Sequence, residues 1–309
     1  MLATHINPDG DAIGSLTAMG LALAALGKET TLYCASPIPA VYRFLTGTTR
    51  ITGQYDPSES YDTAIILDCG DFERVGPAYA NIKETATIIN IDHHDTNTGF
   101  GDFQIVDTAA SATAEILYRL FKALDVAILP DMATSIYTGI FTDTGSFRFS
   151  NTNRAAFAIC EEMVASGMDP YTVAQNVYGT YSLGRIKLLN LALDSIELAA
   201  GGKVSIMTLT REMLAETRTQ PEDIDGLINY ARRIEDVKLA VLLQELENGS
   251  QPANGKPRFH VSLRSDGGVD VAEIAATFGG GGHKEAAGFN IDSPLGDIRA
   301  QIVRLAEKL

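Results

Sequence analysis

The chain has 309 residues, of which 45% are hydrophobic and 20% are charged, and its formal net charge at pH 7 is −15. The length favours two domains, and the acidic balance disfavours a protein that grips long duplex nucleic acid, because phosphates require a basic surface. With no apolar run of roughly 20 residues, no signal-type start and three scattered cysteines, we expect a cytoplasmic protein without membrane spans or a disulfide framework.

The first part of the chain alternates short apolar runs with helical patterns. We predict strands at 31–34, 63–67 and 87–91 and helices at 12–26, 110–124, 132–141 and 154–167. Such alternation predicts an α/β fold with a parallel sheet covered by helices on both faces. The strand that delivers His5 is reduced to Met1–Thr4, which suggests that residues upstream of Met1 are missing.

The order of elements changes after a predicted helix at 183–200, which two glycines close. We then predict strands at 204–209, 239–246 and 259–264 and helices at 222–233, 271–278 and after Pro294. The last two strands, joined by a polar loop at 247–256, indicate an antiparallel pair and a smaller α+β domain. The predicted domains are therefore 1–182 and 203–309, joined by a linker helix at 183–202.

Ligand-type side chains cluster at the ends of the apolar runs. They are Asp92, His93 and His94 after 87–91, Asp68 after 63–67, Asp143 after 132–141, and His5, Asp9 and Asp11 in the turn before 12–26. Imidazole with carboxylate suits Mn²⁺, Fe²⁺ or Zn²⁺ better than Ca²⁺. Each aspartate alone is equally compatible with a helix cap, but together they match a two-metal centre, with Asp68 well placed to bridge metals about 3.5–4 Å apart.

A run of four glycines, Gly279–Gly282, precedes His283. Consecutive glycines let backbone N–H groups approach an anion, and we expect a following helix to add its dipole, although a flexible linker is the rival interpretation. Arg264, at the end of a predicted strand, is a candidate to bind a phosphate through two parallel N–H···O hydrogen bonds. For the pair Arg232-Arg233 we favour an exposed helix face.

Together these motifs resemble the DHH phosphoesterases with an attached DHHA1 domain, and within them the nanoRNase/pAp phosphatase (NrnA-like) group. The matching segments are 5–15, 67–71, 92–94, 138–145 and 279–288, in the order of the family. The resemblance implies a metal-dependent hydrolase that converts RNA of two to five nucleotides to mononucleotides, or 3′-phosphoadenosine 5′-phosphate to AMP. The alternatives are a phosphodiesterase for linear or cyclic signalling dinucleotides, a manganese-dependent inorganic pyrophosphatase and a non-catalytic nucleotide sensor. A homodimer is also compatible with such a chain.

The resemblance also implies a role for each site residue. One divalent ion, usually Mn²⁺, is expected on His5, Asp9 and Asp68, and a second on Asp11, Asp68, His93 and Asp143. His94 is expected to contact the scissile phosphate, Asp92 to support the site, and Arg264, Gly281, Gly282 and His283 to hold the nucleotide end. One departure is Gln244, where relatives commonly carry a basic residue, so we expect altered or weaker recognition of a terminal phosphate.

Overall fold

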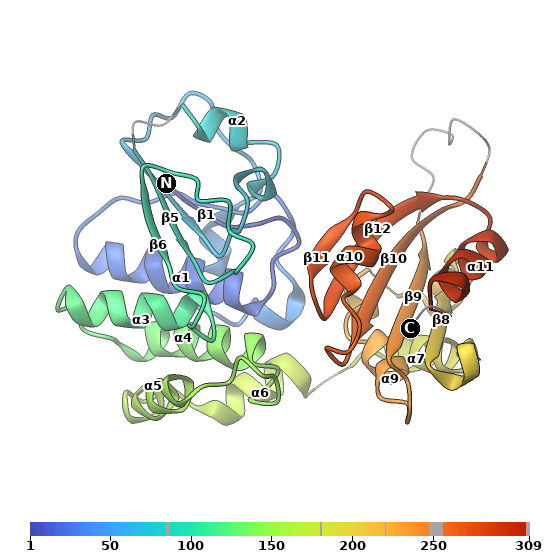
Figure 1. Cartoon of the computed structure of the whole chain (residues 1–309). Helices are drawn as coiled ribbons and strands as arrows, with labels where there is room; N and C mark the ends of the chain where they lie inside the picture. Colours follow the sequence, from blue (N-terminus) through green and yellow to red (C-terminus); the bar gives the residue numbers. More distant parts are fainter. Residues whose placement is uncertain (85–86, 180, 220, 247–255, 307–309) are drawn as a thin grey trace. The chain divides into compact units, whose positions relative to one another are not determined.

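The computed structural model of the chain describes residues 1–84, 87–179, 181–219, 221–246 and 256–306. The chain folds as two compact units, Met1–Thr180 and Tyr181–Leu309 (Figure 1). The polar loop predicted at 247–256 lies outside the described residues except for its last position. No helix within these described ranges is long and apolar enough to cross a membrane.

A parallel six-stranded sheet forms the centre of the first unit, which confirms the predicted fold class. The strands run in the order β3-β2-β1-β4-β5-β6. They are β1 (Leu2–Ala3), β2 (Leu32–Tyr33), β3 (Ile51–Thr52), β4 (Thr63–Leu67), β5 (Thr87–Asp92) and β6 (Phe103–Val106). The chain moves outward from β1 to β3 and then in the opposite direction from β4 to β6. The adjacent strands β1 and β4 therefore form a switch point, where sheets of this kind bind ligands.

Helices cover both faces of this sheet, but unequally. One face packs on α1 (Gly10–Ala25), α3 (Thr113–Ala123) and α4 (Pro130–Asp143), and α5 (Arg154–Ala165) packs on α4 (Figure 1). The other face packs on two short elements, η3 (Phe72–Val75) and α2 (Tyr79–Ile82). Because Leu67 faces the first layer while Ala64 and Ile66 face the second, β4 is apolar from Ala64 to Leu67, as buried parallel strands are. The unit ends with α6 (Pro170–Tyr178), a helix that the sequence analysis did not predict.

Glycines let α1 and α4 approach each other closely. A Cβ atom added to Gly14 would lie 2.5 Å from the carbonyl oxygen of Ser135. A Cβ atom added to Gly139 would lie 2.6 Å from the Cβ of Ala114 and 2.7 Å from Oδ1 of Asp11, distances that real Cβ atoms essentially never show. The absence of a side chain at Gly139 therefore fixes the separation of three helices and the space around Asp11.

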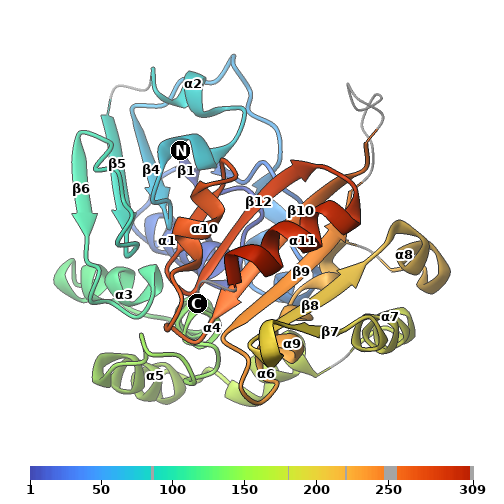
Figure 2. The ribbon, with the colours of Figure 1, turned by 45° about the vertical axis from the view of Figure 1, so that its right-hand side comes forward.

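A mixed six-stranded sheet forms the second unit, in the order β11-β12-β10-β9-β8-β7. The strands are β7 (Glu197–Ala199), β8 (Val204–Leu209), β9 (Leu239–Glu245), β10 (Arg258–Ser265), β11 (Gly281–His283) and β12 (Ala286–Asp292). The predicted antiparallel pairing of β9 with β10 is confirmed. One face packs on α10 (Val271–Ala276) and α11 (Leu295–Ala306), and the other on α7 (Leu183–Asp194) and α9 (Ile228–Arg232) (Figure 2). This unit also contains the short helix α8 (Arg211–Thr217), which contacts α7.

Three helix predictions for the second unit are wrong. The helix predicted at 183–200 ends at Asp194, because Ser195 hydrogen-bonds with Ala192 and Thr208 and the chain then pairs with β8 as β7. The helix predicted at 222–233 is broken into a 3₁₀ turn at Pro221–Ile224 and α9, with Gly226 between them at φ 81°. The glycine run leads into a β-hairpin, β11–β12, and not into a helix.

The buried side chains of α7 also bear on the predicted domain limits. Leu188 and Ala192 pack in one cluster with Met207 of β8 and Leu242 of β9. This helix is therefore part of the second unit's core. The limits 1–182, 183–202 and 203–309 stay a prediction about functional domains.

Replacing Gly139 with alanine should destabilise the first unit. The added methyl group would clash with the Cβ of Ala114 on α3 and with Oδ1 of Asp11 on α1. Overpacking of this kind costs about 1–3 kcal/mol of stability. Urea unfolding followed by circular dichroism measures the change. Gly53→Ala is the matched control in the same unit, because its Cβ would meet the nearest atom at an ordinary 3.7 Å. Equal stability of the two variants would contradict the expected clash.

Candidate metal centre

Three neighbouring strands of the first unit end at the same edge of the sheet. His5 follows β1, Asp68 follows β4, and β5 ends at Asp92, with His93 and His94 directly after it. Because β1, β4 and β5 are adjacent and parallel, their carboxyl ends lie side by side. The sheet therefore brings together residues that lie far apart in the sequence, as the sequence analysis expected.

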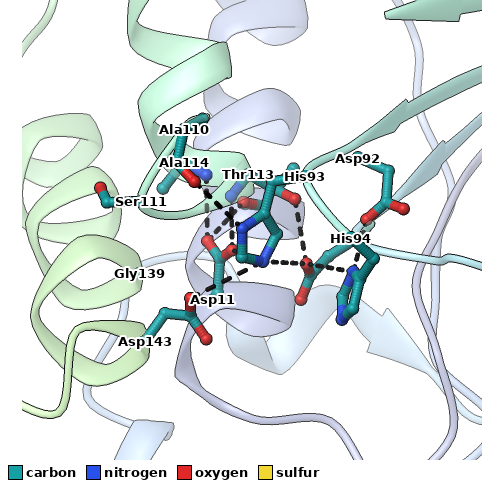
Figure 3. Close-up of polar contacts among 12 residues, drawn as sticks. Asp11, Asp92, His93, His94, Ala110, Ser111, Thr113, Ala114, Gly139 and Asp143 are labelled. Atoms are coloured by element: carbon teal, nitrogen blue, oxygen red, sulfur yellow. Dashed lines mark hydrogen bonds and ion pairs between the residues drawn. The ribbon is translucent and has the colours of Figure 1, made fainter. Parts of the chain in front are cut away.

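Two helices complete the cluster with a carboxylate each. Asp11 lies in the first turn of α1, and Asp143 is the last residue of α4. The Nε2 atom of His93 lies between them, 3.9 Å from Oδ2 of Asp11 and 3.6 Å from Oδ2 of Asp143 (Figure 3). It is also 3.7 Å from Oδ1 of Asp68. Four predicted ligands thus surround one point.

A second group of ligands shares Asp68 with the first. The Nε2 atom of His5 is 3.5 Å from Oδ2 of Asp68, and ligand atoms of His5, Asp9 and Asp68 all lie within 4.8 Å of one another. Asp9 is also the N-cap of α1, since its Oδ1 accepts hydrogen bonds from the backbone N–H groups of Asp11 and Ala12. The helix cap uses one carboxylate oxygen of Asp9 and leaves the second oxygen for another partner. This geometry is therefore compatible with Asp9 both as a helix cap and as a metal ligand.

Hydrogen bonds set the orientation of the histidine rings. Nδ1 of His5 lies 2.8 Å from the carbonyl oxygen of Ile6, and Nδ1 of His93 lies 3.3 Å from that of Ala110. A carbonyl oxygen can only accept, so Nδ1 carries a proton and Nε2 is the ring nitrogen that faces the carboxylates. This arrangement is typical of histidines that bind metals.

Asp92 and His94 form a separate pair beside the cluster. Asp92 is fully buried, and its Oδ1 lies 2.7 Å from Nδ1 of His94 (Figure 3). The other oxygen of Asp92 accepts a hydrogen bond from Nδ2 of Asn97 at 2.6 Å, and the same amide group of Asn97 contacts Oδ1 of buried Asn90. Ligand atoms of Asp68, His93 and His94 also lie within 4.8 Å of one another.

Several residues that position the carboxylates were not predicted from the sequence. Oδ2 and Oδ1 of Asp11 accept hydrogen bonds from the backbone N–H groups of Thr113 and Ala114, at 2.6 and 3.0 Å, at the first turn of α3. The hydroxyl of Thr113 donates to Asp68 at 2.9 Å. Nδ2 of Asn151 donates to Oδ2 of Asp143 at 3.1 Å. Local sequence carries no signal for these long-range contacts.

Burial and mutual repulsion dominate the electrostatics of the carboxylates. Burial raises the pKa of Asp11 well above its usual value, and the charges of Asp68 and Asp143 raise it further. Burial likewise raises the pKa of Asp143 to about 7, and the charges of Asp9 and Asp68 add to this effect against the opposing charge of His93. For Asp68, burial is outweighed by the hydrogen bond and charge of His5 and the charges of His93 and His94, so its pKa is lowered.

The pKa of His94 is raised to about 9, although its burial acts in the opposite direction. The hydrogen bond from His94 to Asp92 and the negative charges of Asp68 and Asp92 stabilise the imidazolium form. A metal ligand must give up its proton, whereas a phosphate contact gains from keeping it. The pair therefore suits a phosphate contact at His94.

The backbone at Asp68 is held in the left-handed region, with φ 56°. Aspartate tolerates this conformation better than most residues, but it still stores strain. The conformation turns the chain directly after β4, where Asp68 meets the ligands that follow β1 and β5.

The donor set fits divalent cations. Carboxylates that repel one another, with imidazole Nε2 atoms facing them, need a divalent cation among them, because burial in such a site otherwise opposes ionisation of the carboxyl groups. Oxygen and imidazole nitrogen together suit Mn²⁺, Fe²⁺ or Zn²⁺. All six residues predicted as metal ligands lie in this cluster.

The second unit places the predicted substrate residues on neighbouring strands. In the sheet register, Arg264 of β10 lies opposite Ala286 of β12, and Ala286 lies opposite His283 of β11. Gly282 has φ 145°, and a Cβ there would lie 2.5 Å from the backbone of Ala286 and Ala287, so the hairpin requires glycine. The expected helix dipole is absent here, because β12 follows this turn.

Comparisons with known proteins match both units. The DHH family, N-terminal domain, matches residues 1–140, and the DHHA1 domain matches residues 201–308. A Thermus thermophilus protein named bifunctional oligoribonuclease and PAP phosphatase NrnA is 33% identical over 287 residues, which cover 93% of this chain and 82% of that protein. A Bacillus subtilis protein of the same name is 25% identical, with 95% and 89% covered. The structure of an exopolyphosphatase-related protein from Bacteroides fragilis matches with a TM-score of 0.89 at 25% identity, covering 99% of this chain and 92% of that one.

The contribution of Asp143 to the affinity for a divalent metal should rise with pH up to about 7 and then level off. Below its raised pKa, Asp143 is protonated, and the proton competes with the metal for the same carboxylate. Titration calorimetry with Mn²⁺ at pH 6, 7 and 8 measures this dependence. Asp143→Asn should bind more weakly and depend less on pH. Asp131→Asn, at the exposed other end of α4, should behave like the wild type; a loss as large as that of Asp143→Asn would contradict the assignment.

Asp92→Asn should lower the pKa of His94 from about 9 toward the usual value near 6.5 in metal-free protein. The raised value means that the charged imidazole stabilises the native state at pH below 6.5 and that this stabilisation is lost as the pH rises through 9. NMR titration of the His94 ring measures the shift. Asp56→Asn, an exposed site in the same unit, is the control. An unchanged pKa in Asp92→Asn would refute the pairing.

Proposed function

Because this chain belongs to the DHH family, with a DHHA1 domain in its second half, we propose that it hydrolyses phosphate esters of short nucleotides at a two-metal centre. The proposed substrates are RNA of two to five nucleotides, cleaved to mononucleotides, and 3′-phosphoadenosine 5′-phosphate, converted to AMP. The names of the Thermus thermophilus and Bacillus subtilis relatives support this choice. The observation that carries the proposal is the sharing of buried Asp68 between two groups of ligand-type side chains.

The proposed cofactor is a pair of divalent ions, and Mn²⁺ is the first choice. The residues proposed to hold one ion are His5, Asp9 and Asp68, and those proposed for the other are Asp11, Asp68, His93 and Asp143. When bound, such a pair lowers the pKa of an attacking water and offsets negative charge on the phosphate. A cationic pair would also offset the repulsion that raises the pKa values of Asp11 and Asp143.

The residues beside the ligands have roles that follow from their contacts. Asp92 keeps His94 protonated at neutral pH, so His94 brings an N–H donor and a positive charge to the scissile phosphate. Asn97 fixes the second oxygen of Asp92 and so holds the pair in one orientation. Thr113 orients the shared carboxylate of Asp68. No protein nucleophile is required for this chemistry.

In the second unit, we assign the capture of the nucleotide to Arg264, Gly281, Gly282 and His283. The exposed glycines of β11 present backbone N–H groups, and Arg264 and His283 flank Ala286 on the same face of the sheet. Small substrates with few phosphates suit a chain of net charge −15, which repels long polyanions. The homodimer and the cytoplasmic location stay predictions from the sequence.

A panel of four substrates tests the proposal. We expect manganese-dependent hydrolysis of 3′-phosphoadenosine 5′-phosphate and of a five-nucleotide RNA, and slow turnover of pyrophosphate and of a cyclic diadenylate. Asp68→Asn should reduce the rate about a hundredfold or more, because both metal sites lose their shared charge. Release of phosphate and mononucleotides, separated by chromatography, is the measurement.

Asp131→Asn, which changes an exposed carboxylate of the same unit, should keep wild-type activity. Thermal melting of both variants shows whether each is folded. Hydrolysis that survives in folded Asp68→Asn, or that continues in excess chelator, would rule out the two-metal mechanism. Preference for pyrophosphate or for the cyclic dinucleotide would instead reassign the substrate.

A further inference from the structure

Arg264 carries a positive charge that no acidic side chain balances within the described part of the second unit. Its guanidinium is half-buried and donates one hydrogen bond, from Nη1 to the carbonyl oxygen of Leu263 at 2.9 Å. The remaining N–H groups of the fork have no carboxylate within ion-pair distance among the described residues. Removing a charged group from water without an opposite charge beside it costs free energy, so the site suits an anion.

A second guanidinium lies close to the first. Arg232 is the last residue of α9, and the preceding residue is held to the sheet, because the buried hydroxyl of Ser205 donates to the carbonyl oxygen of Ala231 at 2.9 Å. Arg232 is half-buried, unlike Arg233, which is exposed. The exposed helix face predicted for this basic pair is therefore right for Arg233 and wrong for Arg232.

The register of the sheet connects Arg264 to Arg232 through the hairpin residue Glu285. The hairpin residue Glu285 precedes Ala286, the neighbour of Arg264 on β12, and its carbonyl oxygen accepts from the N–H of Ser265 at 3.0 Å. The carboxylate of Glu285 lies 3.7 Å from Nη2 of Arg232. Burial lowers the pKa of Arg264, and the positive charge of Arg232 lowers it further, so the two charges repel each other.

We propose that Arg232 and Arg264 together bind the terminal phosphate of the nucleotide, and that Glu285 is the counter-ion that Arg232 exchanges for it. This proposal rests on the proposed function for the identity of its ligand. A phosphate monoester carries close to two negative charges at neutral pH, which two guanidinium forks match. His283 lies on the same face of the sheet, one strand beyond Ala286, and supplies a third polar group.

Gln244, the position on β9 where relatives commonly carry a basic residue, lies away from Arg264 in the sheet. Ala240 is the β9 neighbour of Arg264, whereas Gln244 lies opposite His260, four residues further along the strand. Gln244 is therefore not beside Arg264 in the sheet, and Arg258, at the other end of β10, pairs with Asp292 at 3.6 Å. Recognition of a terminal phosphate is expected beside Arg264 and not beside Gln244.

Binding measurements on the full-length, metal-free protein test the proposal without any turnover. The ligands are AMP, adenosine and the dinucleoside monophosphate ApA, which carries a diester but no terminal phosphate. Arg232→Gln should weaken AMP roughly 10- to 100-fold, the usual loss for one charge-assisted contact, and should change adenosine and ApA little. Arg232→Lys keeps the charge but loses the planar guanidinium, so its affinity for AMP should lie between those of the wild type and Arg232→Gln.

Arg233→Gln is the matched control, since it removes the same charge from the same helix end at an exposed site. It should leave the affinity for AMP within about twofold of that of the wild type, because salt screens the interactions of exposed charges. Glu285→Gln should tighten AMP binding, because the phosphate no longer competes with a carboxylate. A purely structural ion pair would instead make Glu285→Gln lose affinity together with Arg232→Gln.

Several outcomes would overturn the proposal. They are a wild-type protein that binds AMP no better than adenosine, an equal loss in Arg232→Gln and Arg233→Gln, and a loss for ApA as large as that for AMP. Failure of the proposed function is distinguishable, because it would appear as absent hydrolysis with AMP binding and its dependence on Arg232 intact.

Discussion

Repulsion among buried carboxylates is the constraint on which the rest of the first unit depends. Asp11, Asp68 and Asp143 come from three different segments of the chain; Asp11 and Asp68 are fully buried, and Asp143 is half-buried beside them. Such a cluster opposes folding unless hydrogen bonds, imidazole groups and cations offset its charge. The backbone amides at the start of α3, the histidines after β1 and β5, and the proposed metals all supply that compensation.

The division of labour between the units follows from their sheets. A parallel sheet with a switch point gathers strand ends at one edge, which suits a compact centre of ligands. The mixed sheet of the second unit leaves part of one face to polar side chains, among them Arg264 and His283, and suits the recognition of a small anion. The chemistry and the choice of substrate are thus assigned to separate surfaces of one chain.

Sequence patterns were sufficient where an element is dictated locally. The mainly apolar runs of β4 and β8 predicted those strands to the residue, and each predicted ligand lies at or beside a strand or helix end that the sequence pattern identifies. What remained hidden depends on contacts between distant segments. The amide of Asn151 reaching Asp143, the N–H groups of Thr113 and Ala114 on Asp11, and the strand that replaces the end of α7 are decided by tertiary pairing.

The left-handed backbone of Asp68 places a limit on how this protein can evolve. Glycine at this position would relax the strain and would favour the fold at that turn, yet it would delete the carboxylate that both ligand groups share. Selection for thermal stability and selection for metal binding therefore act in opposite directions on one codon. A homologue with glycine at this position would be recognisable as a relative that had traded catalysis for robustness.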